Sequence, residues 1–148
     1  MPQDIPSKPE DLGQLSTDRV RQFMFDQTLQ QNLLEMDLTF SEPQILSAMD
    51  FAALDYNEMD PKVHTVSPRS LPFALCFLYG VAFYLTQGKI MEWTRNDINY
   101  TAGNMTASPE QARIKHYKEL MMMFMTEWKT RAKLHKLAIN IACVAGPL

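Results

Sequence analysis

The chain has 148 residues, of which 46% are hydrophobic and 21% charged, so it is long enough to bury a core and too apolar to be disordered. Its net charge of −3 argues against a general nucleic-acid-binding protein. Residues 1–66 hold twelve acids and four bases, whereas residues 109–148 hold three acids and seven bases. This polarity could serve head-to-tail contact between copies, but separate solvated faces for acids and bases are the favoured explanation.

The first residues predict an extended arm and a short helix. Residues 1–15 contain three prolines and a glycine among acids, and they lack the basic and then apolar order of a signal peptide. Ser16 or Thr17 can cap a helix that runs to about Asp26. Residues 27–39 show no sustained period, so no element is predicted there.

Three further helices share one start signal, a serine followed by proline in the first turn. Ser41 and Ser108 each open a capping box, and Ser70 precedes an apolar run. In the last helix the apolar residues recur at spacings of 3, 4, 3 and 4, which is the pattern of a packed seam. The three helices are expected over residues 41–59, 70–94 and 109–137. The seam residues are Ile114, Tyr117, Met121, Phe124 and Trp128.

The second of these helices raises the question of a membrane. Residues 70–88 carry no formal charge, and residues 71–85 are almost wholly apolar. A spanning helix needs roughly 20 apolar residues, and this run stops short of that. We therefore expect no membrane contact, and a central helix that other helices or partner subunits surround on all sides.

The remaining segments predict a short hairpin and a tail. Residues 96–107 place alternating β-formers around Ala102-Gly103-Asn104, which can supply a turn. Residues 138–148 are uncharged and alternate in character, so an extended tail that lies on the core or on a partner is expected. The predicted fold is all-α: a small helical bundle over residues 16–137, a short hairpin or loop insertion, and extended N- and C-terminal arms.

A search for catalytic motifs finds no glycine-rich phosphate loop, no GxSxG and no HExxH. His64, His116 and His135 are scattered, and surface or packing roles explain them. Cys76 and Cys143 lie among apolar residues, as buried reduced thiols do. We expect no enzyme, no metal and no cofactor.

Surplus apolar surface points to protein contact instead. The chain has eleven methionines, and four of them surround one turn of the last helix, so some must lie off its seam. Thioethers pack adaptably, which suits a subunit interface, although a methionine-rich core fits equally well. The candidate interface residues are Met121, Met122, Met123, Met125, Lys136, Ile139, Asn140, Ile141, Val144, Pro147 and Leu148.

Much of the chain, residues 33–146, resembles a group of tailed-bacteriophage virion proteins, the head–tail connectors or adaptors of the neck. The resemblance begins with the acidic-aromatic lead-in and capped helix of residues 37–45, and continues with Tyr56-Asn57 before Pro61. The apolar helix over 75–85 follows. The later motifs are Arg95-Asn96, Gly103-Asn104, Tyr117, Glu127, and Lys136 with Asn140. Tails of this family often end in an aromatic residue and glycine, whereas this chain ends in Val144-Ala145-Gly146-Pro147-Leu148.

The resemblance implies a virion structural protein that is assembled in the host cytoplasm and forms a homo-oligomeric ring between portal and tail. Its partners would be further copies of itself, the portal protein and another neck or tail protein, with DNA only as passing cargo. Another phage part, such as a tail-completion, baseplate or capsid-associated protein, is the first alternative. A small helical protein-binding regulator is the second.

Overall fold

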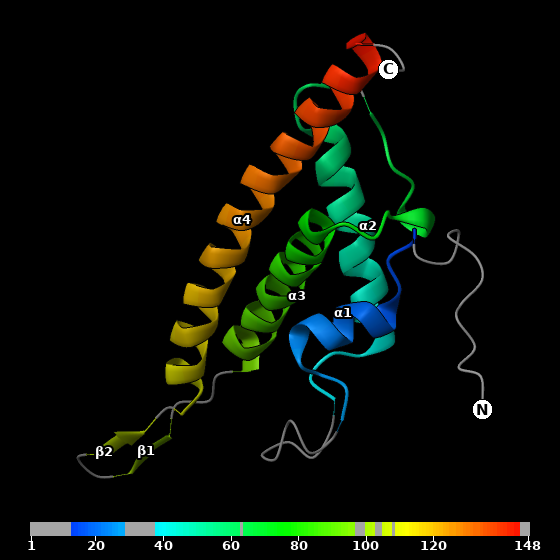
Figure 1. Cartoon of the computed structure of the whole chain (residues 1–148). Helices are drawn as coiled ribbons and strands as arrows, with labels where there is room; N and C mark the ends of the chain where they lie inside the picture. The colour runs from blue at the N-terminus through cyan, green and yellow to red at the C-terminus, as the bar shows by residue number, and fades with distance from the viewer. Residues whose placement is uncertain are drawn as a thin grey trace, which may run out of the picture.

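The computed structural model describes residues 13–28, 38–62, 64–96, 100–102, 105–107 and 109–145. Within these residues the chain forms four α-helices, one short 3-10 helix and one two-stranded antiparallel hairpin, so the predicted all-α helical bundle with a hairpin insertion is confirmed. Figure 1 shows the elements in chain order, which are α1 (Thr17–Met24), α2 (Glu42–Glu58), η3 (Pro68–Ser70), α3 (Leu75–Asn96), β1 (Tyr100–Ala102), β2 (Met105–Ala107) and α4 (Pro109–Ala145).

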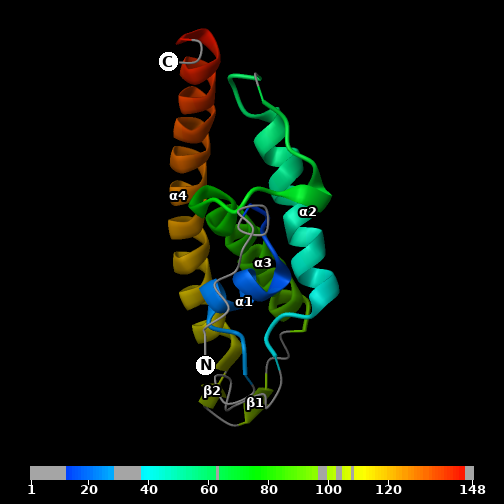
Figure 2. The same cartoon turned by 45° about the vertical axis from the view of Figure 1, so that its right-hand side comes forward.

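The apolar helix α3 is the centre of the bundle, as its sequence predicted. It lies between α4 and α2, and α1 crosses it (Figure 2). α3 and α4 run antiparallel, and aromatic pairs join them along the predicted seam. The ring centroids lie 4.6 Å apart for Trp93 and Tyr117, 6.2 Å for Tyr79 and Phe124, and 5.8 Å for Phe77 and Trp128.

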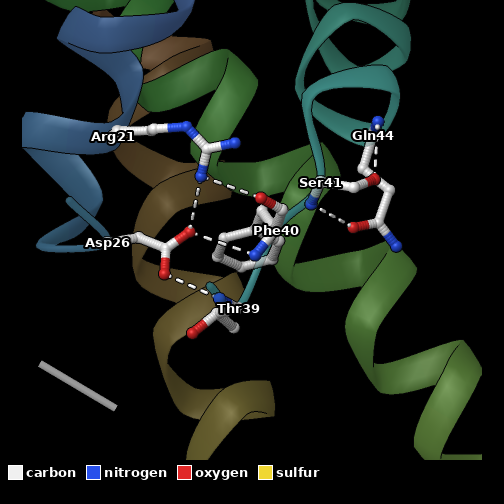
Figure 3. Close-up of polar contacts among 6 residues, drawn as sticks. All are labelled: Arg21, Asp26, Thr39, Phe40, Ser41 and Gln44. Atoms are coloured by element: carbon white, nitrogen blue, oxygen red, sulfur yellow. Dashed lines mark hydrogen bonds and ion pairs between the residues drawn. The ribbon is translucent and has the colours of Figure 1, made fainter. Parts of the chain in front are cut away.

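α2 begins where the sequence predicted. The Ser41 side chain accepts a hydrogen bond from the Gln44 backbone N–H, and the Gln44 side chain accepts one from the Ser41 N–H, which completes the capping box (Figure 3). The helix then buries one face against α3 and η3. Its buried residues are Ile45, Ala48, Met49, Ala52, Ala53 and Tyr56.

α1 is capped by Ser16, whose side chain accepts a hydrogen bond from the Arg19 N–H, and it ends at Phe25 in the left-handed conformation with φ 53°. Asp26 therefore lies beyond the helix rather than in it. Its buried carboxylate accepts hydrogen bonds from the backbone N–H groups of Thr39 at 2.7 Å and Phe40 at 3.0 Å, and it pairs with Arg21 (Figure 3). This network fastens the end of α1 to the start of α2.

The start of α3 differs from the prediction. Ser70 does not cap it, because residues 68–70 form a separate 3-10 turn and the α-helix begins only at Leu75. The backbone between them is extended and pairs with the segment before α1. Leu15 N–H donates to the Leu71 carbonyl, and Phe73 N–H donates to the Gly13 carbonyl, both at 2.8 Å. These bonds commit residues 71–73 to an extended conformation.

The C-terminal segment also differs from the prediction. α4 continues to Ala145, so residues 138–145 are helical rather than part of an extended tail. No proline or glycine interrupts the chain before Gly146-Pro147, and each further helical residue adds a backbone hydrogen bond. The sheet found among the described residues is the β1–β2 hairpin alone, which offers this segment no strand to pair with.

Several predictions fall on residues outside those described. They are most of the N-terminal arm, at residues 1–12, the hairpin turn Gly103-Asn104, the Ser108 cap, and Pro147 and Leu148 of the tail.

Candidate functional site

Trp128 is the central residue of the packing between α4 and its neighbours. It is fully buried, and its indole lies against Gly80 of α3, where an added Cβ would stand 2.8 Å from Cε3. The indole N–H donates a 2.8 Å hydrogen bond to Oδ2 of Asp55 on α2. One side chain of α4 is thereby fixed to both α3 and α2.

About two turns further along α4, Tyr56 of α2 fixes that helix a second time. Its hydroxyl lies 2.8 Å from Nδ1 of His135, and its ring packs edge-on against His64. Burial, and then the nearby Cys76, raises the pKa of Tyr56 to about 12. Burial, with repulsion from His64, lowers the pKa of His135 below its usual range. The two histidines that looked scattered in the sequence thus meet at one tyrosine.

Lys136 lies in the same cluster, which corrects its predicted place on the contact surface. The side chain is fully buried, the ammonium donates to the Met59 carbonyl, and it lies 4.7 Å from the centroid of the Tyr56 ring. Burial lowers its pKa, and the nearby Asp60 opposes that change. Lys136 holds the end of α2 against α4 within the chain.

Beyond Lys136 the helix α4 carries an apolar stripe that faces away from the bundle. We define the distal stripe as Leu134, Leu137, Ile141 and Val144, which recur at spacings of 3, 4 and 3. All four are exposed, and the exposure reaches 68% for Ile141 and 82% for Val144. A 3-4-3 apolar stripe is the surface that one helix presents to another.

The other predicted interface residues are divided. Ile139 and Asn140 are half-buried, and Pro147 and Leu148 lie outside the described residues. Of the four methionines, Met122 and Met123 are exposed, whereas Met121 and Met125 are half-buried. The exposed pair is available for contact. Leu134 was missed in the sequence, although its spacing from Leu137 and Ile141 was the available signal.

A second exposed apolar surface lies on α2. We define the α2 face as Leu46, Asp50, Phe51 and Leu54, in which the three apolar residues are all close to half exposed. Phe51 also borders a groove of about 560 Å³ between the first half of α2 and the second half of α3. The sequence prediction missed this surface because it followed only the buried stripe of α2. Apolar residues on both sides of that helix were the signal.

A smaller groove of about 410 Å³ lies where the end of α1 meets α3 and α4. Phe23, Phe25, Tyr79 and Met123 are among its lining residues, and Phe25 is 78% exposed. Phe25 caps α1, so its exposed ring follows from the left-handed turn that lets Asp26 reach Phe40.

The two cysteines lie in different environments. Cys76 is buried, as expected, and burial raises its pKa to about 11, which disfavours the reactive thiolate. Cys143 is exposed, so its predicted burial is wrong. Among the described residues no three His, Cys, Asp or Glu side chains are grouped as a metal site would require.

Within the described residues no helix combines the length and the apolar character needed to cross a bilayer. Comparisons of the chain with known protein families, with curated proteins and with solved structures find no significant match.

Proposed function

We propose that this chain is a structural subunit of a tailed-bacteriophage virion, a head–tail connector or adaptor. In this proposal its copies form a ring between portal and tail through which DNA passes. The chain acts by contact rather than by catalysis and needs no cofactor. Its partners are other copies, the portal protein and a further neck or tail protein.

The observation that carries the proposal is the meeting of two separate parts of the resemblance. Tyr56 belongs to the motif before Pro61, and Lys136 to the motif that ends at Asn140, and the two side chains stack in one buried cluster. Asn57 of the first motif exchanges two hydrogen bonds with the backbone of Val66. Tyr56 of the first motif thus packs against α4 at Lys136, where the distal part of that helix begins.

The exposed surface supports the same proposal. The cluster fixes α4 at Lys136, and the distal stripe continues past it without burial in its own chain. Exposed apolar surface of this kind is typical of protein contact sites. The uneven charge of the chain fits contact between copies, and its net charge of −3 suits DNA that passes through a ring without being held.

Labelling of the particle tests the proposal. Antibodies raised against the purified chain should decorate virions between head and tail in electron micrographs, and particles assembled without the chain should lack attached tails. Decoration of a baseplate or capsid would support the other virion roles instead. Absence of the chain from purified virions would overturn the proposal and favour a regulator.

A further inference from the structure

We propose that the distal stripe of α4 docks on the α2 face of a second copy of this chain, head to tail. The inference rests on the proposed ring subunit and deepens it, because it assigns the two surfaces that join neighbouring copies.

α4 is much longer than α3, the helix it packs against. At 37 residues α4 is about 55 Å long, whereas α3 at 22 residues is about 33 Å. Lys136 is the last buried residue of α4 among those described, and the end of α4 reaches beyond the end of α2 (Figure 1). The stripe lies opposite the buried residues Trp128, Ala132 and Lys136, so it is directed away from its own core.

Both surfaces are apolar, and the charges beside them are opposite in sign. In α2 the acids Glu42, Asp50 and Glu58 are exposed, and the helix contains no basic residue. The distal half of α4 exposes Lys129 and Lys133 instead. Asp50 lies between Leu46 and Leu54 at i±4, and Lys133 lies four residues before Leu137, so each charge borders an apolar row. Because the acids of α2 complement the lysines of α4, we infer that the partner bound to each surface is a second copy of the chain.

Within one chain the two surfaces do not cover each other. α2 contacts α4 through Asp55, Tyr56 and Met59 near its C-terminal end. The α2 face and the distal stripe lie outside these contacts, and both remain exposed in the same chain. Contact between unlike surfaces of identical chains is heterologous, and it forms a ring where the rotation between neighbouring copies closes. One helix against one face is a small interface, so isolated pairs are weak and closure of the ring stabilises them.

The sharpest test mixes two variants. One cannot bind through its distal stripe, and the other cannot bind through its α2 face. Ile141→Glu blocks the stripe and Leu54→Glu blocks the α2 face, and both side chains are more than half exposed, so folding should persist by circular dichroism. In sedimentation velocity the wild-type chain should form concentration-dependent oligomers and each variant alone a monomer. The mixture should form one-to-one dimers and nothing larger. The control Lys118→Glu, exposed on the other half of α4, should assemble like the wild type.

A charge exchange provides the second measurement. Asp50→Lys and Lys133→Glu should each weaken self-association about tenfold, and the double variant should recover most of the loss. A monomeric wild type at millimolar concentration, a mixture that stays monomeric, or a double variant weaker than both singles would overturn the inference. Binding of the distal stripe to another virion protein, without binding to a second copy of this chain, would also overturn the inference. If antibodies label the neck but the variants self-associate like the wild type, this interface is refuted and the proposed function stands. If the chain self-associates through these surfaces but antibodies do not label the neck, the proposed function is refuted and the interface stands.

Discussion

The indole of Trp128 lies so close to Gly80 that a Cβ at this glycine would stand 2.8 Å from Cε3. Gly80→Ala should therefore force α3 and α4 apart and lower the free energy of unfolding by about 1–3 kcal/mol, the usual range for overpacking. Urea unfolding measures this loss of unfolding free energy. The matched control is Gly88→Ala in the same helix, where an added Cβ meets nothing within 4 Å. That variant should gain up to about 1 kcal/mol from helix propensity, and equal losses in both would contradict the packing argument.

The hydrogen bond from Trp128 to Asp55 predicts a coupled pair. Asp55→Ala leaves the buried indole N–H without its acceptor, which should lower the free energy of unfolding by about 1–3 kcal/mol. Trp128→Phe removes the donor. The double variant should be less destabilised than the sum of the two single variants, as measured by denaturant unfolding, because the bond is lost only once. Strict additivity would show that the two residues act independently.

Asp26 predicts a loss at the junction of α1 and α2. Its carboxylate serves two backbone N–H groups and Arg21, so Asp26→Ala should cost about 2–3 kcal/mol of unfolding free energy. The control is Asp18→Ala, an exposed acid in the first turn of α1, for which a loss below about 1 kcal/mol is expected from the helix dipole. Comparable losses at the two sites would argue that the network contributes little.

His135 makes stability depend on pH. Burial and His64 lower its pKa in the folded chain below the usual 6.5, so the unfolded chain binds more protons near that pH. Its contribution is therefore complete above pH 6.5 and decreases as the pH falls below that value. Urea midpoints at pH 7.5 and 5.5 should differ in the wild type and differ less in His135→Gln. His116→Gln, at an exposed site of the same helix, should keep the wild-type difference.

The parts of the fold that the sequence predicted are those that local chemistry decides. Ser41 with Gln44 marks the start of α2, and the spacing of Tyr117, Phe124 and Trp128 marks the seam of α4. Both signals lie within one turn or one helix face. The parts that failed depend on distant partners. The sequence around Ser70 gives no sign that backbone hydrogen bonds with Leu15 and Gly13 keep residues 71–73 extended.

The candidate site shows the same division. Ile141 and Val144 were predicted as contact residues from their composition, and they are exposed. Lys136 was included because it forms a motif with Asn140 in the resemblance, but it is buried. Its ammonium donates to the Met59 carbonyl and lies over the Tyr56 ring, almost eighty positions earlier in the chain. Sequence spacing cannot reveal such a pair. The meeting of His64 with His135 at Tyr56 is hidden in the same way.

Deletion of residues 138–148 separates folding from assembly. Every buried residue of the described core precedes residue 138, so the shortened chain should keep its helical spectrum and lose less than about 1 kcal/mol, as surface changes do. Ile141 and Val144 are removed, so self-association in sedimentation velocity should disappear. Deletion of residues 135–148 is the contrast, because it also removes His135 and Lys136 and should destabilise the fold strongly. Normal assembly of the shorter deletion would show that the end of α4 is not the contact element.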